Sequence, residues 1–432
     1  MKLSIHGGIP LRDSKTHPWP RWPVSTEEDE ERLLKVLRSG VWSYNGPMEG
    51  EFIKRWAAFT GTEYALAAAN GTVTLQLALE ALDIGWGDEV ILPGLTWQAT
   101  AASVVDVNAV PILVDVDPRT WCIDPAAVEA AITPRTRAIM PVHLYGSMPE
   151  MDAILAIAEK HKLAVIEDCA HQHGSAWRGR PAGSLGTIGS FSLQLSKVLT
   201  SGEGGLLTTS DRDIWIRLDA LRNCGRRPEG AMPEADKGGG RYGSDGDLIQ
   251  SGNYRITEFQ AAVLLGALER LPEQMERRAR SGAILDAGLA EITGVEPMLR
   301  DERQTSRAYF NYAFRYNQDE FAGGGISSHI FHRALSAELG IPFEACYEPL
   351  NNCSLYRPRT KKRYHISEEH WAAIDPGRFS LPVCERTFLE QSVTVHHKLL
   401  LDDDAAMHQV LEAIRKIEAH ADELRSMGHA KA

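Results

Sequence analysis

Short apolar runs alternate with amphipathic segments along the chain from about residue 60. The β-rich runs lie at 89–95, 110–116, 138–144, 163–168, 188–193 and 205–209. Helical patterns separate several of these runs, at 72–82, 96–107, 124–132 and 150–161. In segment 72–82, the apolar residues follow the spacing i, i+3, i+4, i+7, which puts them on one face of a helix. These residues are Leu75, Ala78, Leu79 and Leu82. This alternation predicts a mainly parallel sheet, covered on both faces, with a site beyond the carboxyl ends of its strands.

The two ends of the chain show other patterns. Residues 1–25 hold four prolines with Trp19 and Trp22 between them, which predicts an extended arm whose tryptophans pack on this chain or on a partner subunit. A helix is expected at 258–271, ended or kinked by Pro272. The last helix carries an apolar stripe formed by Met407, Val410, Leu411, Ile414 and Ile417.

These patterns divide the chain into an N-terminal arm (1–25), a large α/β domain (26–275) and a smaller α+β domain (276–432). A length of 432 residues also favours more than one domain. The polar, glycine-rich stretch 226–252 predicts a long mobile loop, and such loops in compact domains are usually functional or disordered.

Composition narrows the class of protein. A hydrophobic content of 43% and a charged content of 24% are typical of a soluble globular protein. The net charge of −12 disfavours a nucleic-acid partner. Six cysteines without a CxxC pair predict reduced thiols in a cytoplasmic protein. Since no apolar run approaches the roughly 20 residues of a membrane helix, no membrane partner is expected.

One lysine stands out chemically. Lys197 follows the apolar run 188–193 and directly precedes a glycine-dense turn. A lysine amine with an ordinary pKa of about 10.4 becomes a nucleophile, able to form a Schiff base, where burial or nearby cations remove its proton. The alternative is an ordinary surface lysine beside a loop.

Three further features fit the same site. Gly71 and Thr72 open a helix after a small-residue strand end, where free N–H groups can hold a phosphate; an ordinary helix cap is the alternative. Trp97 stands at a strand-to-helix junction, where an aromatic ring can stack on a flat cofactor or simply belong to the core. Asp168 ends a buried strand and can keep a pyridine nitrogen protonated.

The residues after Asp168 admit two interpretations. Strict alternation places Asp168 and His171 on opposite faces, so both reach one ring only if the strand ends near Ala170 and the chain bends. Cys169, His171 and His173 alternate and would share a strand face as zinc ligands. No second ligand cluster accompanies them, so no metal is expected. A phosphate seat, a stacking aromatic, an acid and a lysine in this order instead describe a pyridoxal 5'-phosphate site.

At these motifs the chain resembles the sugar and cyclitol aminotransferases of the DegT/DnrJ/EryC1/StrS family. The matching segments are Gly71-Thr72, Trp97, Glu167 to Gly174, Ser190 to Gly205 and Ser251 to Glu258. The resemblance covers nearly the whole chain. It implies the type I aminotransferase fold, an α/β architecture with a mainly parallel seven-stranded sheet in the large domain and a smaller α+β C-terminal domain.

The resemblance also implies roles for single residues. Ser192 joins Gly71-Thr72 at the phosphate, Asp168 binds the pyridine nitrogen, and Lys197 binds the cofactor covalently and then removes the α-proton of the amino donor. His171 is placed at the other ring face or at the phenolic oxygen. Asn253 reaches the phosphate of the neighbouring subunit, which implies a homodimer with shared active sites.

Within the family, three segments resemble enzymes that aminate keto-cyclitols of the scyllo-inosose type in aminoglycoside biosynthesis. These segments are 17–23, 194–200 and 393–400. The implied donor is L-glutamine or L-glutamate. Tyr44, Gln194 and His396 are candidates for holding the acceptor.

Two departures leave the acceptor open. His171 stands where the cyclitol branch often has Gln and where the aminohydroxybenzoate-forming branch has His, and the loop 42–49 does not match the cyclitol pattern. A nucleotide-linked keto-sugar, or chemistry like that of 3-amino-5-hydroxybenzoate synthase, is the alternative. A dehydratase branch has His in place of the lysine, so Lys197 favours transamination. A regulatory relative would add a DNA-binding segment, which is not visible.

Overall fold

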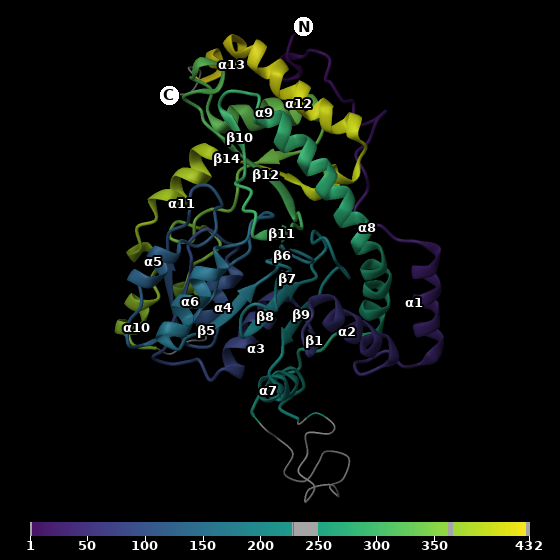
Figure 1. Ribbon diagram of the computed structural model, residues 1–432, viewed down its shortest axis with the longest axis vertical. Coiled ribbons are helices and arrows are strands. Elements are labelled where there is room, and N and C mark those ends of the chain that lie inside the picture. Colours follow the sequence, from purple (N-terminus) through teal and green to yellow (C-terminus); the bar gives the residue numbers. More distant parts are fainter. Residues whose placement is uncertain (1, 227, 229–248, 362–365, 429–432) are drawn as a thin grey trace, which may run out of the picture.

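The structure is a computed structural model, and it describes residues 2–226, 228, 249–361 and 366–428. The loop expected at 226–252 therefore lies for most of its length outside the described residues. Figure 1 shows a larger body built around one sheet and a smaller body beside it, with α8 (Glu258–Leu289) running from one to the other. None of the helices in these ranges is both long and apolar enough to cross a bilayer.

The larger body is organised by a seven-stranded sheet. In sheet order, the strands are β1 (Tyr64–Ala68), β9 (Gly205–Thr209), β8 (Ile188–Ser192), β5 (Ala164–Asp168), β4 (Thr136–Ile139), β2 (Glu89–Pro93) and β3 (Val110–Val114). β9 runs antiparallel to both of its neighbours, and the other pairs are parallel. The predicted mainly parallel seven-stranded sheet is thus confirmed. The run expected at 138–144 ends as a strand at Ile139, shortly before Pro141, which has no N–H to donate.

Helices cover both faces of this sheet. Alternate strand residues enter two different apolar clusters, since Leu66 and Ala68 belong to one and Ala65 and Ala67 to the other. The covering helices are α2 (Pro47–Thr60), α3 (Gly71–Ala81), α4 (Ala99–Asp106), α5 (Pro125–Ala130), α6 (Met151–His161) and α7 (Arg212–Arg222). The preceding helix, α1 (Glu27–Ser39), packs on α8 at the outer edge of this body. The four helices expected between the strands are confirmed, with ends shifted by a few residues.

The helix expected at 258–271 does not end before Pro272, so this part of the prediction is wrong. α8 (Glu258–Leu289) is 32 residues long and contains Pro272 in its interior. Its first half packs on α1 and α2, and its second half packs on α12 (Asp404–Ala419) and β10 (Val295–Pro297). Tertiary packing on both sides of the proline therefore sustains the helix. The domain boundary expected at 275/276 lies inside this helix, which is shared by the two bodies.

The smaller body is an antiparallel sheet with helices packed on it. The strands, in sheet order, are β10 (Val295–Pro297), β12 (Asn311–Tyr316), β14 (Ser392–His396) and β13 (Phe343–Glu344). The helices that belong to this half of the chain are α9 (Ser328–Leu339), α10 (Glu368–Ala373), α11 (Pro382–Arg386), α12 (Asp404–Ala419) and α13 (Ala421–Gly428). The whole apolar stripe predicted for the last helix is buried in α12.

Short segments tie the two bodies together. A small sheet combines β6 (Ala176–Trp177) and β7 (Arg180–Pro181) from the larger body with β11 (Gln304–Ser306). The N-terminal arm contains one short 3-10 turn, η1 (Ser4–His6), and packs its tryptophans on this same chain. Trp19 is buried in the smaller body, where its indole N–H donates to the carbonyl oxygen of Leu339 at 2.8 Å.

Candidate active site

A cavity of about 790 Å³ lies at the carboxyl ends of the parallel strands. Its wall contains most of the predicted site residues, namely Gly71, Thr72, Trp97, Asp168, His171, Ser192, Gln194 and Lys197. These residues come from four separate stretches of the chain, and the crossover topology of the sheet brings them together.

Lys197 lies in the connection between the antiparallel strands β8 and β9. Its side chain is buried, and its Nζ stands 4.0 Å from the centre of the Phe310 ring. Burial lowers the pKa of the Lys197 amine to about 8, although the nearby carboxylate of Asp168 acts in the opposite direction. The amine can therefore lose its proton near neutral pH, as a nucleophilic lysine requires.

Asp168 is the last residue of β5, and its carboxylate is held on both oxygens. Oδ1 accepts from the N–H of Ala170 at 3.1 Å, and Oδ2 accepts from the hydroxyl of Thr100 at 2.9 Å. The Thr100 hydroxyl in turn lies 2.9 Å from that of Thr96. Burial raises the pKa of Asp168, while these two hydrogen bonds and the charge of Lys197 lower it by less. The carboxylate is thus fixed in direction and poised to share a proton.

His171 reaches the same cavity because β5 ends at Asp168 and the chain turns immediately afterwards. This turn is the bend that the sequence pattern required for Asp168 and His171 to reach one ring. The imidazole stacks on Phe310, with ring centres 3.9 Å apart, and its Nε2 lies 3.1 Å from the hydroxyl of Tyr347. Burial places the pKa of His171 well below its ordinary value, so the ring is neutral. Its buried Nδ1 has no hydrogen-bond partner among the described residues.

The start of α3 forms a seat for an anion. Asn70 caps the helix by accepting from the N–H of Val73, which leaves the N–H groups of Gly71 and Thr72 without an acceptor in the described chain. A Cβ at Gly71 would lie 2.7 Å from the Cβ of Ser192, so only glycine lets β8 and α3 approach this closely. Free N–H groups, a helix N-terminus and two hydroxyls suit a phosphate.

Trp97 and Gln194 complete the predicted wall. Trp97 precedes α4, remains 46% exposed, and is tilted toward Tyr347 with ring centres 5.5 Å apart. The Gln194 side chain is already engaged, since its Oε1 accepts from both the N–H and the hydroxyl of Ser196. Trp97 therefore offers a free ring face to the cavity, whereas Gln194 stabilises the connection that carries the lysine.

Three predicted residues do not line the cavity of this chain. Asn253 is exposed, and Tyr44 lies beneath the guanidinium of Arg255, 4.0 Å from ring centre to Cζ. The carbonyl oxygen of the Asn253 side chain accepts from the N–H of Arg255, so Tyr44 and Asn253 gather around one arginine. His396 lies at the end of β14, where its Nδ1 accepts from the N–H of Lys398.

The alternative zinc site would need Cys169, His171 and His173 to lie together, and the structure does not group these three. Among the described residues, the group of ligand atoms close enough to hold an ion joins Cys169 with His143 and Glu167, not with His171 and His173.

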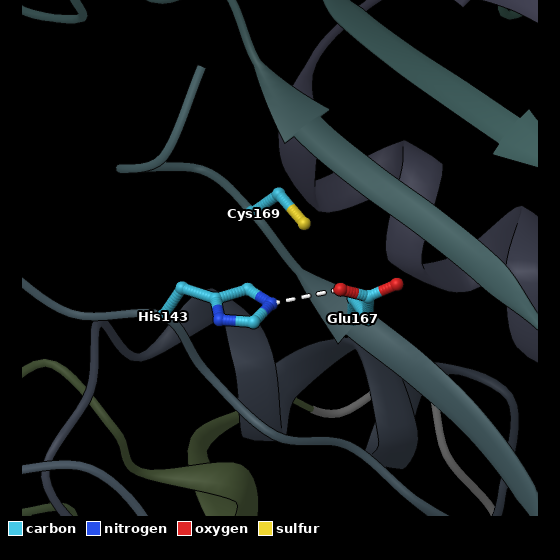
Figure 2. A group of neighbouring side chains, drawn as sticks. All are labelled: His143, Glu167 and Cys169. Carbon is cyan, nitrogen blue, oxygen red and sulfur yellow. Dashed lines mark hydrogen bonds and ion pairs between the residues drawn. The ribbon is translucent and has the colours of Figure 1, made fainter. Parts of the chain in front are cut away.

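In Figure 2, His143 points its Nε2 at Glu167 across 3.0 Å, with Cys169 beside them. Both Glu167 oxygens are already saturated, because they also accept from the backbone N–H groups of Gly183, Leu185 and Gly186. Burial alone would raise the pKa of Glu167, but these bonds and His143 bring it below its ordinary value. The cluster therefore anchors the strand end that carries Asp168.

Several cavity residues were not anticipated. Phe310 and Tyr347 come from the smaller body, and neither lies in a motif that carries chemistry by itself. Thr100 lies one helical turn after Thr96, in a segment where only Trp97 drew attention. A threonine pair i, i+4 at a strand-to-helix junction is the signal that could have revealed it.

Comparison with known proteins agrees with this geometry. Residues 23–400 match the model of the DegT/DnrJ/EryC1/StrS aminotransferase family. The L-glutamine:2-deoxy-scyllo-inosose aminotransferase of Streptoalloteichus tenebrarius is 45% identical over 98% of this chain and 99% of its own length.

Two solved structures share the fold. A 3-amino-5-hydroxybenzoic acid synthase has a TM-score of 0.79 at 31% identity and covers 93% of this chain and 99% of its own. DesI, solved in the presence of its TDP-sugar product, has a TM-score of 0.80 at 28% identity and covers 99% of this chain and 98% of its own. The chain is therefore an aminotransferase with the fold that its motifs predicted, and it belongs to the DegT/DnrJ/EryC1/StrS family.

Proposed function

We propose that this enzyme transfers an amino group from L-glutamine, or from L-glutamate, to a keto-cyclitol of the scyllo-inosose type, with pyridoxal 5'-phosphate as cofactor. The observation that carries the proposal is the convergence of Lys197, Asp168, His171 and the Gly71-Thr72 seat on one cavity. The name of the relative from Streptoalloteichus tenebrarius supports the choice of donor and acceptor.

The residues present fit the cofactor. The free N–H groups at Gly71 and Thr72, with the Ser192 hydroxyl, would hold its phosphate, and Lys197 would hold it covalently. When bound, pyridoxal phosphate supplies an electron sink for the carbon that bears the donor's amino group. Asp168 would keep the proton on the ring nitrogen.

The other side chains would confine the chemistry. The exposed indole of Trp97 would cover one face of the cofactor's ring. The neutral imidazole of His171, which stacks on Phe310, would contact the cofactor's ring from another side of the cavity. The Lys197 Nζ, with its pKa near 8, would take the α-proton from the donor and deliver a proton to the cofactor carbon on the other side of the donor's nitrogen.

The charge of the cavity favours a neutral acceptor over a nucleotide-linked sugar. Among its described lining residues, Lys197 is the one cationic side chain, whereas Glu80, Asp168 and Glu203 are acidic. The fourth acidic side chain of the wall, Asp106, is paired with Lys361. A diphosphate would need additional cations to offset its charge. A polyhydroxylated ring needs only hydrogen-bond donors and acceptors.

We further infer that two subunits share each site. Tyr44 and Asn253 lie together around Arg255 but outside this chain's own cavity, as expected of residues that serve a neighbouring subunit. The adjacent surface is apolar, with Leu37, Val41 and Trp42 each about half exposed. Trp42 adjoins the 251–258 motif, because its carbonyl oxygen accepts from the N–H of Glu258 at 3.0 Å.

A two-stage absorption experiment tests the reaction. L-glutamine should convert the yellow enzyme to its aminated, colourless form, and 2-deoxy-scyllo-inosose should restore the colour. A nucleotide-linked keto-sugar serves as the competing acceptor. Restoration by the sugar and not by the cyclitol would overturn the acceptor. Failure of the first stage with L-glutamine and also with L-glutamate would overturn the donor.

Shared sites are tested by mixing two inactive variants. Chains carrying Lys197→Ala and chains carrying Asn253→Ala should form mixed dimers in which one site has both residues intact. Activity that appears only after co-refolding supports the shared site, and a monomeric molar mass in solution contradicts it.

A further inference from the structure

Three segments far apart in the sequence meet behind the lysine. They are the arm at 17–23, the β8–β9 connection at 194–200 and the stretch 393–400. The connection lines the cavity through Gln194, Ser196 and Lys197, whereas the other two segments do not line it. The indole N–H of Trp22 donates to the carbonyl oxygen of Leu195 at 3.0 Å. The Nε2 of His397 lies 3.0 Å from the carbonyl oxygen of Ser196. Two consecutive carbonyls directly before Lys197 are thus bound by side chains from outside the large body's sheet.

The direction of the second bond is fixed by Arg278. Its Nη2 lies 3.2 Å from Nδ1 of His397, and a guanidinium can only donate. His397 therefore accepts at Nδ1 and donates from Nε2–H to Ser196. Burial and the charge of Arg278 place the pKa of His397 well below its ordinary value, which agrees with a neutral ring in this one tautomer.

The surroundings make this arrangement rigid and costly. His397 is fully buried, and Trp22 meets it edge to face with ring centres 4.5 Å apart. Arg278 is 1% exposed, yet its Nε and Nη1 have no partner among the described residues. A buried, incompletely bonded cation costs stability, so its presence here indicates a role in this place. Among the described residues, the side chain to which Arg278 donates is His397.

We propose that His397, oriented by Arg278 and covered by Trp22, is a positioning residue that fixes the backbone of Ser196 and thereby the place of the Lys197 amine in the cavity. The inference rests on the proposed role of Lys197 as cofactor anchor. Because N–H of Lys197 also donates to the carbonyl of Gln194 at 2.8 Å, the connection is a tight turn in which a shift at Ser196 moves the lysine directly. Small displacements of a reacting group cost much of its rate.

Two ligands separate positioning from general damage. Pyridoxal 5'-phosphate reports covalent capture by Lys197, and pyridoxine 5'-phosphate, which lacks the aldehyde, reports the phosphate seat alone. For His397→Phe, we expect capture by the cofactor-free protein to slow about tenfold or more, while pyridoxine phosphate binds as to the wild type. His397→Gln, whose amide can still donate to Ser196, should recover most of the rate.

A matched control is available in the smaller body. His332 is also buried, and its Nε2 lies 2.8 Å from the carbonyl oxygen of Ser392, far in sequence from the lysine. His332→Phe should lower the unfolding temperature as His397→Phe does, yet leave capture unchanged. Trp22→Phe removes the bond to Leu195 while it keeps an aromatic ring beside His397, and it serves if His397→Phe does not fold. It should also slow capture.

The outcomes are distinct. Wild-type protein that captures no cofactor on Lys197 would contradict the proposed function. Wild-type protein that captures normally, with His397→Phe and Trp22→Phe equally fast, would overturn the positioning role. The same holds if every variant, His332→Phe included, loses capture and pyridoxine phosphate binding together, because the effect would then be loss of fold.

Discussion

The hydroxyl of Thr100 donates to Oδ2 of Asp168 across 2.9 Å and so links the first turn of α4 to the end of β5. With the N–H of Ala170 on Oδ1, this bond fixes the plane of the carboxylate. Both bonds stabilise the charged form of an acid whose pKa burial raises. The hydrogen bond from Thr100 therefore helps to keep Asp168 ionised and in place, as it must be to keep a proton on the cofactor's ring nitrogen.

Thr100→Val should lower turnover about tenfold, since loss of roughly 1.4 kcal/mol of stabilisation is a factor of ten in rate. Valine keeps the shape of threonine but removes the donor, so the pKa of Asp168 rises further. Steady-state kinetics check the prediction, with Thr100→Ser as the variant that keeps the hydroxyl. Equal turnover in the valine and serine variants contradicts it.

Capture of pyridoxal phosphate by the cofactor-free protein should depend on pH. The neutral amine is the reactive form, so the rate should rise with pH and level off above the Lys197 pKa of about 8. The Asp168 carboxylate raises that pKa, so Asp168→Asn should move the midpoint to lower pH. Stopped-flow absorption at a series of pH values gives both midpoints. A wild-type midpoint near that of free lysine would show that the amine is not desolvated.

Gly71→Ala should weaken cofactor affinity by about one to two orders of magnitude. The new Cβ would lie 2.7 Å from that of Ser192, forcing α3 away from β8 and opening the phosphate seat. Gly50→Ala is the matched control, because a Cβ at this position in α2 meets nothing within 4 Å. Equilibrium titration with pyridoxal phosphate should separate the two variants, and equal affinities would show that the seat tolerates the methyl group.

The buried ion pairs near the expected subunit interface make a stability prediction. Arg222 binds both Glu49 and Asp219, and Arg222 and Glu49 are 4% and 1% exposed. Arg222→Leu should cost about 3–5 kcal/mol in the free energy of unfolding, because two buried carboxylates lose their partner. Arg55→Leu, which breaks exposed pairs with Glu51 and Glu269, should cost no more than about 1 kcal/mol. Denaturant unfolding distinguishes the two costs.

More of the candidate site than of the residues packed around it could be predicted from the sequence. Gly71, Asp168 and Lys197 could be found because each sits where a strand meets a turn or helix, and local pattern places such junctions at one sheet edge. Phe310 and Tyr347 could not, because they enter the cavity through packing of the smaller body. Pro272 misled for a related reason, since contacts on both sides of it outweigh its local preference. The hydrogen bond from His397 to Ser196 joins residues 201 positions apart in the sequence, so no local pattern predicts it.

The most direct test of the central claim is borohydride reduction of the loaded enzyme followed by mass mapping of its peptides. The account predicts one reduced cofactor per chain, attached to Lys197, and none in Lys197→Ala. A label on another lysine, or no label on a yellow wild-type enzyme, would show that the cavity around Asp168 and His171 is not where the chemistry occurs.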